Sequence, residues 1–141
     1  MEKAQIELKR HNELRAKHHA PPLVLADWLC KRAESHAKHM AATKQFEHSD
    51  CVLNGKDLGE NIYWTSGITK GGAATDSWYS EIKDHDYKDG EKSWEKTGHF
   101  TQLVWKGSKE VGFGYTDNYV VANYYPAGNM MGDFKNNVLK P

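Results

Sequence analysis

The chain has 141 residues, and its 19 Lys and Arg balance 19 Asp and Glu, which gives a formal net charge of zero. This balance provides no global positive field to gather nucleic acid, so we expect no nucleic-acid partner. Two cysteines, Cys30 and Cys51, are too few for a disulfide scaffold, although one bridge between them stays open. A chain of this length can bury one core, and we expect a single domain over residues 1–141.

The first forty residues predict two helices. Residues 4–19 have a strongly charged helical pattern with Ile6 and Leu14 on one side, where His11 and His18 are further candidates, and a Pro-Pro step ends it. Residues 23–25 form a short apolar link. A second helix follows, capped by Asp27, and its apolar stripe recurs at helical spacing: Leu29, Ala33, Ala37 and Met40.

Small alanines on this stripe indicate close packing of the second helix against a sheet. His36 and His39 lie three residues apart on the same helix and could chelate a metal. They lie beside Lys38 and off the main stripe, so we interpret them as surface histidines.

A polar segment at residues 44–59 lacks periodicity and predicts a long loop. Loops of this length in compact domains are often functional, which draws attention to His48. Residues 59–64 then favour a short strand with Glu60 at its entry.

The middle of the chain predicts a third helix over residues 73–82, with Glu81 at the edge of its buried stripe. On pattern alone, Glu81 is interpreted as a surface glutamate. Residues 84–96 are polar and acidic and predict a surface loop. A further helix begins at Thr97 or Gly98, which puts His99 in its first turn, where the helix dipole favours neutral imidazole.

The last third predicts a β-hairpin. Residues 110–115 and 119–125 read as two strands joined by a turn, and Gly112 and Gly114 leave one face of the first strand bare. A helix or loop must therefore approach that face closely. Residues 130–141 are expected to form an irregular C-terminal tail.

Several of these segments together resemble the signatures of the CAP superfamily, which comprises cysteine-rich secretory, venom-antigen and pathogenesis-related class 1 proteins. Residues 98–105, Gly-His-Phe-Thr-Gln-Leu-Val-Trp, resemble its first signature, and residues 123–129, Asn-Tyr-Tyr-Pro-Ala-Gly-Asn, its second. Further matches follow in order along the chain: His48-Ser49, Gly59-Glu60-Asn61 and Trp78-Tyr79-Ser80-Glu81-Ile82.

The resemblance implies an α+β fold, a three-layer α-β-α sandwich with a small, mainly antiparallel central sheet. It also implies that His48, Glu60, Glu81 and His99 converge in one cleft. Such a cleft suits a divalent metal such as zinc, with His48 and His99 as ligands and the two glutamates orienting the imidazoles. Two protein ligands predict weak, exchangeable binding, since catalytic zinc usually has three.

The chain lacks the many cysteines of secreted members and is similar to the Golgi-associated plant pathogenesis-related proteins. That branch implies an intracellular, peripheral Golgi membrane location and self-association; secretion is the alternative if a leader has been removed. Glu2 stands where that branch has a myristoylated glycine, so we expect no myristoyl anchor at this N-terminus.

Three functions remain open. The preferred hypothesis is a non-enzymatic binding module for anionic lipid surfaces, sterols or protein partners in defence or signalling. The basic N-terminal region and the aromatics Tyr87 and Trp94 are its candidate contact surfaces. The second is a weak metal- or serine-dependent hydrolase, with Glu60, Glu81 and Ser66 as candidate catalytic residues and Ser49 as another serine. The third is a self-associating scaffold that forms a homodimer.

Overall fold

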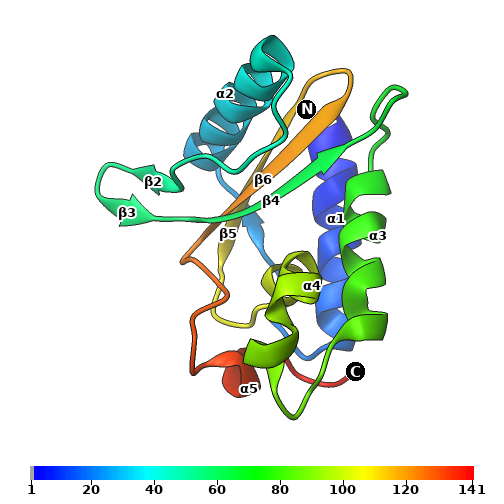
Figure 1. The fold of residues 1–141 in the computed structure, drawn as a ribbon, viewed down its shortest axis with the longest axis vertical. Helices are drawn as coiled ribbons and strands as arrows, with labels where there is room; N and C mark the ends of the chain where they lie inside the picture. The colour runs from blue at the N-terminus through cyan, green and yellow to red at the C-terminus, as the bar shows by residue number, and fades with distance from the viewer. Residues whose placement is uncertain (1) are drawn as a thin grey trace.

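The structure is a computed structural model that describes residues 2–141. Helices α1 (Glu2–Lys17), α3 (Ala73–Tyr79) and α4 (Gly90–Leu103) cover one face of a four-stranded sheet, and α2 (Asp27–Thr43) covers the other (Figure 1). The predicted fold class, a three-layer α-β-α sandwich, is confirmed.

The central sheet is mainly antiparallel. Its strands lie in the order β1 (Val24–Leu25), β5 (Glu110–Tyr115), β6 (Tyr119–Tyr125) and β4 (Gly59–Trp64). The predicted hairpin is the β5–β6 pair, and β1 adds to β5 in parallel, so the segment expected as a link is a short edge strand. In the β4–β6 pair, Glu60 lies opposite Asn123, one position in from the first pair, Gly59 and Tyr124, so the glutamate sits near the start of β4.

Helix α2 lies directly on the bare face of β5. A Cβ atom added to Gly112 would overlap the backbone of Cys30, and one added to Gly114 would overlap the backbone of Glu34. The predicted close approach is confirmed, because only glycine lets the helix backbone reach the strand. Ala33 and Ala37 on the facing stripe are fully buried.

The burial of Leu14, His11 and His18 agrees with the predicted side of this helix, whereas Ile6, Glu7 and Arg15 differ from the prediction. Ile6 is 46% exposed, and Leu14 shares the interior with polar residues that are fully buried, namely Glu7, His11, Arg15 and His18. These side chains are tolerated inside because hydrogen bonds satisfy them. Glu7, for example, accepts from the amide and the hydroxyl of Thr75.

Helix α4 begins earlier than the sequence predicted. Residues 84–96 were expected to be a loop, but the helix starts at Gly90, with Asp89 as the N-cap that accepts from the amide of Lys92 at 3.2 Å. His99 therefore lies in the third turn, and the prediction of a first-turn position was wrong. The third predicted helix is shorter than expected, since α3 gives way to a 3₁₀ turn, η1 (Ser80–Asp84).

Three other expectations also changed. The loop at residues 44–59 carries a small hairpin, β2 (Val52–Leu53) with β3 (Lys56–Asp57). The C-terminal tail contains a one-turn helix, α5 (Phe134–Asn137), anchored because Phe134 is 2% exposed. His36 is buried and its Nε2 lies 2.7 Å from the carbonyl oxygen of Glu47, so of the pair His36 and His39 only His39 lies on the surface.

Both cysteines are free thiols, Cys30 buried and Cys51 partly buried. Within residues 2–141, none of the helices combines the length and apolar character needed to cross a bilayer.

Candidate metal-binding cleft

His99 is held by Glu81 from the neighbouring 3₁₀ turn. Glu81 Oε2 lies 2.8 Å from His99 Nδ1, while Oε1 accepts from the backbone amides of His99 at 2.9 Å and Phe100 at 3.0 Å. Two successive amides that reach an outside carboxylate are typical of a helix N-terminus. Here the carboxylate of Glu81 lies beside the third turn of α4, which runs without a break from Gly90 to Leu103.

His48 is held by Glu60 from strand β4. Its Nδ1 lies 3.0 Å from Glu60 Oε1, which also accepts from the backbone amide of Ser49 at 2.8 Å. Glu60 Oε2 accepts from the Ser49 hydroxyl at 2.6 Å and from Asn123 at 3.1 Å. The glutamate side chain is only 1% exposed, whereas that of His48 is 53% exposed. The carboxylate is therefore the fixed partner of the pair.

These hydrogen bonds keep Glu60 ionised. Burial by itself would raise the pKa of Glu60, but the hydrogen bonds from His48, Ser49 and Asn123 outweigh it and hold the pKa at about 2. A carboxylate that accepts from Nδ1 fixes the imidazole tautomer, because the proton must then sit on Nδ1. The Nε2 lone pair of His48 is left free. Glu81 is bonded to Nδ1 of His99 in the same way, so the Nε2 lone pair of His99 is also free.

The two imidazoles face one another across the cleft. Their ring centroids are 6.5 Å apart with an interplanar angle of 22°, and His99 also lies parallel to Trp78 at 6.2 Å and 9°. Among the described residues, His99 Nε2 is buried and has no hydrogen-bond partner. A buried lone pair without a donor is unfavourable, and a cation in the cleft would satisfy it.

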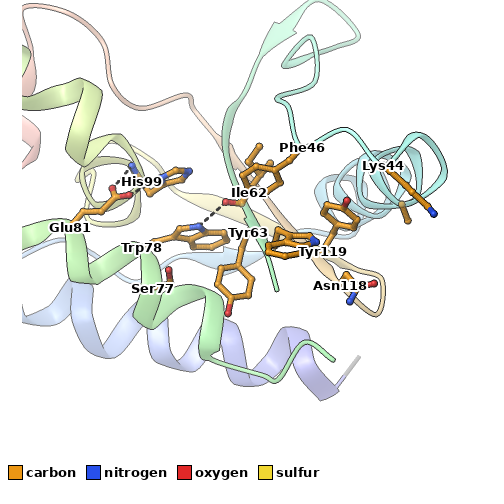
Figure 2. A pocket seen from close by; sticks show the side chains of 12 residues that line it. Lys44, Phe46, Ile62, Tyr63, Ser77, Trp78, Glu81, His99, Asn118 and Tyr119 are labelled. Carbon is orange, nitrogen blue, oxygen red and sulfur yellow. Dashed lines mark hydrogen bonds and ion pairs between the residues drawn. The ribbon is translucent and has the colours of Figure 1, made fainter. Parts of the chain in front are cut away.

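Two cavities meet at His99. One of about 500 Å³ is lined by His48, Cys51, Glu60 and His99. The other, of about 710 Å³, runs from His99 and Glu81 past Trp78 toward Lys44, Phe46 and Tyr119 (Figure 2). Trp64 also lines this cavity. The candidate site therefore joins a polar pocket to an apolar groove, as ligand sites commonly do.

The structure brings four of the predicted site residues together, and Ser66 is not among them. His48, Glu60, Glu81 and His99 form the two facing pairs. Ser66 is exposed in the turn after β4, and Ser49 donates to Glu60 rather than to an imidazole. Within residues 2–141, neither serine hydroxyl is hydrogen-bonded to a histidine.

Sequence reasoning missed one donor at the site. Cys51, considered only for a disulfide, lies beside His48 and Glu60, and one donor atom from each of the three falls within 4.8 Å of the others. The His-x-x-Cys spacing of His48 and Cys51 was the available signal.

The sandwich and its facing pairs define the class of the molecule, an α+β protein with a histidine–carboxylate cleft. Residues 8–125 match the family described as "CAP: Cysteine-rich secretory protein family". The chain belongs to this family.

Several relatives share most of the chain. It is 42% identical to human Golgi-associated plant pathogenesis-related protein 1, across 95% of this chain and 90% of that protein. It is 35% identical to protein PRY2 of Saccharomyces cerevisiae and 37% identical to human cysteine-rich secretory protein 2. The chain spans 40% and 56% of those two proteins, about half of their length.

One solved structure shares this architecture. The crystal structure of NaASP2 with Zn²⁺ aligns with a TM-score of 0.74 at 28% identity and covers 99% of this chain and 86% of that one. The zinc ion is found in the NaASP2 crystal structure. What the two proteins share is the architecture, over nearly all of the present chain.

Proposed function

We propose that this protein is a non-enzymatic CAP-domain binding module whose cleft holds a divalent metal such as zinc between His48 and His99. The observation that carries the proposal is the unpartnered, buried Nε2 of His99, whose ring stacks with the imidazole of His48. In each pair the carboxylate occupies Nδ1, so both Nε2 atoms present lone pairs. Two neutral imidazoles are ligands that zinc prefers.

The distance between the rings fits a site that closes on the ion. Two imidazoles on one tetrahedral ion, with Zn–N bonds of ~2.1 Å, have ring centres roughly 5 Å apart. The present separation is 6.5 Å, so one ring must move by about 1–1.5 Å. His48 is the ring that moves, because its side chain is 53% exposed and comes from a loop, whereas the His99 side chain is 32% exposed and belongs to α4.

Glu60 and Glu81 would hold the rings while water completes the coordination. When bound, zinc is a Lewis acid that acidifies its water, but two protein ligands hold it weakly. A weakly held ion supports a role in shaping the cleft rather than in turnover. The zinc in the NaASP2 crystal structure supports the choice of metal.

The apolar groove beside the cleft supports binding of lipid surfaces or sterols. Phe46 and Trp64 line it and are 52% and 53% exposed, and Ile68, four residues beyond Trp64, is 70% exposed. Exposed aromatic groups of this kind insert at membrane interfaces or bind partner proteins. The name of the human Golgi-associated relative supports a peripheral Golgi location, whereas the names of other relatives support secretion as the alternative.

Metal binding is tested by calorimetric titration of zinc into the purified protein. We expect binding in the wild type and a loss of about tenfold or more in affinity in His48→Ala and His99→Ala. His39→Ala, which removes an exposed histidine of α2, is the matched control and should bind zinc like the wild type. Unchanged affinity in His99→Ala would contradict the proposed site.

Surface binding is tested by co-sedimentation with neutral vesicles and with vesicles that contain anionic lipid, each with and without zinc. We expect binding that Trp64→Ala weakens, with Trp28→Ala as the control outside the groove. Sedimentation with neither vesicle would reject the lipid proposal and leave protein partners. Light scattering across the zinc titration tests the homodimer.

A further inference from the structure

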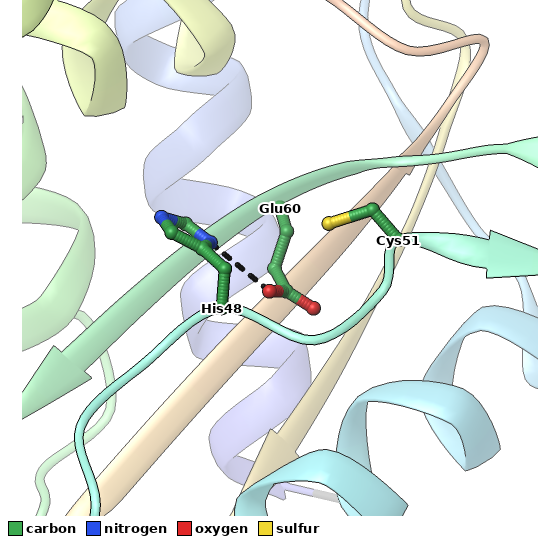
Figure 3. A group of neighbouring side chains, drawn as sticks. All are labelled: His48, Cys51 and Glu60. Atoms are coloured by element: carbon green, nitrogen blue, oxygen red, sulfur yellow. Dashed lines mark hydrogen bonds and ion pairs between the residues drawn. The ribbon is translucent and has the colours of Figure 1, made fainter.

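We propose that His48, Cys51 and Glu60 form a second metal-binding position, in which Cys51 supplies a thiolate ligand. One donor atom from each residue lies within 4.8 Å of the other two. Figure 3 shows Glu60 between the other two side chains, with the sulfur of Cys51 pointing toward the Glu60 side chain and Nδ1 of His48 turned toward the carboxylate. The proposal deepens the proposed function, because it uses the same imidazole of His48.

The donor set suits a zinc-like ion. Zinc takes thiolate at ~2.3 Å and imidazole or carboxylate at ~2.0–2.2 Å, so tetrahedral ligand atoms lie roughly 3.3–3.7 Å apart. No two of the three donors need to close by more than about 1.5 Å from their 4.8 Å limit. A thiolate also discriminates against calcium and magnesium, which prefer oxygen ligands.

The backbone presents Cys51 to this position. Cys51 adopts a left-handed conformation with φ of 55°, uncommon for a residue with a side chain, and the Leu58 amide donates to its carbonyl at 2.8 Å. Its thiol donates to the carbonyl oxygen of Ser49 at 3.6 Å and accepts from the Ser49 hydroxyl at 3.8 Å, and both contacts are long. The thiol is therefore held in place by the backbone while its sulfur stays available.

Metal binding must displace the thiol proton. Burial, and then the nearby Glu60 carboxylate, raise the pKa of Cys51 to about 11, so the free thiol is protonated at neutral pH. The sulfur–hydrogen bond breaks, its electron pair forms the sulfur–metal bond, and the proton passes to solvent; no electron is transferred. Coordination deprotonates thiols in this way.

The two positions exclude one another. A neutral imidazole has one lone pair, so His48 binds through Nε2 in the His48/His99 cleft or through Nδ1 beside Cys51. In Figure 3 the other ring nitrogen of His48 points away from Glu60 and Cys51. A switch between positions therefore needs a change of tautomer, in which the Nδ1 proton moves to Nε2 by way of solvent. Softer ions favour the thiolate position.

The experiment uses Co²⁺ as a spectroscopic probe of the folded, reduced, full-length protein. A cobalt–thiolate bond gives an intense charge-transfer band in the near ultraviolet that cobalt–imidazole bonds lack. We expect this band in the wild type, in His99→Ala, and in the control Cys30→Ser, which removes the thiol of α2. Cys51→Ser should abolish the band and weaken cobalt binding about tenfold or more.

The outcomes separate this proposal from the proposed function. Cobalt binding without a thiolate band, lost in His99→Ala, would overturn the second position and leave the His48/His99 cleft standing. A band lost in both Cys51→Ser and His99→Ala would also overturn it, since the thiolate would then belong to the ion of that cleft. A band that survives in His99→Ala supports it even if zinc titrations reject the cleft. Far-ultraviolet circular dichroism checks that each variant is folded.

Discussion

The carboxylate of Glu81 binds His99 at both its backbone and its ring. Oε1 accepts from the amide of His99 at 2.9 Å and Oε2 lies 2.8 Å from ring Nδ1. One side chain thereby fixes the position of the helix turn, the rotation of the ring and the tautomer. The ring is organised before any ligand arrives, so little conformational freedom is lost on binding.

Glu81→Gln should weaken zinc binding by about 10- to 100-fold, because the amide cannot fix the imidazole tautomer as a carboxylate does. It should also lower the free energy of unfolding by about 1–2 kcal/mol through weaker bonds to two backbone amides. Calorimetry and urea unfolding measure the two effects. Glu95→Gln is the control, since Glu95 is an exposed residue of α4 that also lines the cleft. Equal zinc affinities in both variants would contradict the role of Glu81.

Gly114→Ala should destabilise the fold by about 3 kcal/mol or more, since overpacking at a rigid contact forces backbone to move. The added methyl group would overlap the backbone of Ala33 and Glu34 on α2. Gly67→Ala is the matched control, because a Cβ there meets nothing within 4 Å. Urea unfolding of both variants measures the difference. A change below about 1 kcal/mol at Gly114 would mean that α2 does not press on β5 as described.

The contact at Gly114 could be predicted because bare glycines on a strand and small alanines on a helix both mark close packing. The start of α4 could not, since its first two turns are polar and Gly90 is a poor helix former. Asp89 at the N-cap was a local signal that the acidic surroundings concealed.

The site could be predicted only in part. Glu81 read as an ordinary surface glutamate until the resemblance to a family placed it beside His99. The donor position of Cys51 depends on a left-handed backbone angle and on the β2–β3 hairpin, which the local sequence pattern does not reveal. The burial of Glu7 and Arg15 was missed because a helical pattern counts apolar residues, whereas these two side chains are buried with hydrogen-bond partners from distant segments.

His11 should make the protein less stable in mild acid. It is fully buried and bonded to Thr75 at 2.8 Å and Tyr124 at 2.6 Å, and burial lowers its pKa from 6.5 to about 3. The unfolded chain takes up a proton below pH 6.5 while the folded chain does not, so stability falls as pH drops from 6.5 toward 3. The loss by pH 4.5 is about 3 kcal/mol.

Urea unfolding between pH 7.5 and 4.5 measures this dependence. In His11→Gln the slope over that range should flatten, whatever the absolute stability of the variant. His39→Gln, which changes an exposed histidine, should keep the wild-type slope. If His11→Gln retained the full slope, the loss would have to come from other groups, such as His18, whose pKa burial also lowers.

Arg15→Lys should be strongly destabilising although it preserves the charge. The Arg15 side chain is fully buried, and its guanidinium donates to the carbonyls of Leu103 at 3.1 Å, Trp105 at 2.8 Å and Ser108 at 3.0 Å. These carbonyls lie at and just beyond the C-terminus of α4, where a cation is favoured. A lysine ammonium cannot reproduce the planar fork, so buried acceptors lose their donors, and we expect a loss of about 3 kcal/mol.

Arg10→Lys tests whether this loss comes from the buried fork. Arg10 lies five residues earlier on α1 but pairs with Asp76 at the surface, with 38% of its side chain exposed. Its substitution should change stability by less than about 1 kcal/mol. Because α4 also carries His99, Arg15→Lys should melt that helix end first, visible as faster amide exchange at residues 100–104 than in Arg10→Lys. Equal exchange at residues 100–104 in the two variants would mean that Arg15 does not stabilise the end of α4 beside the cleft.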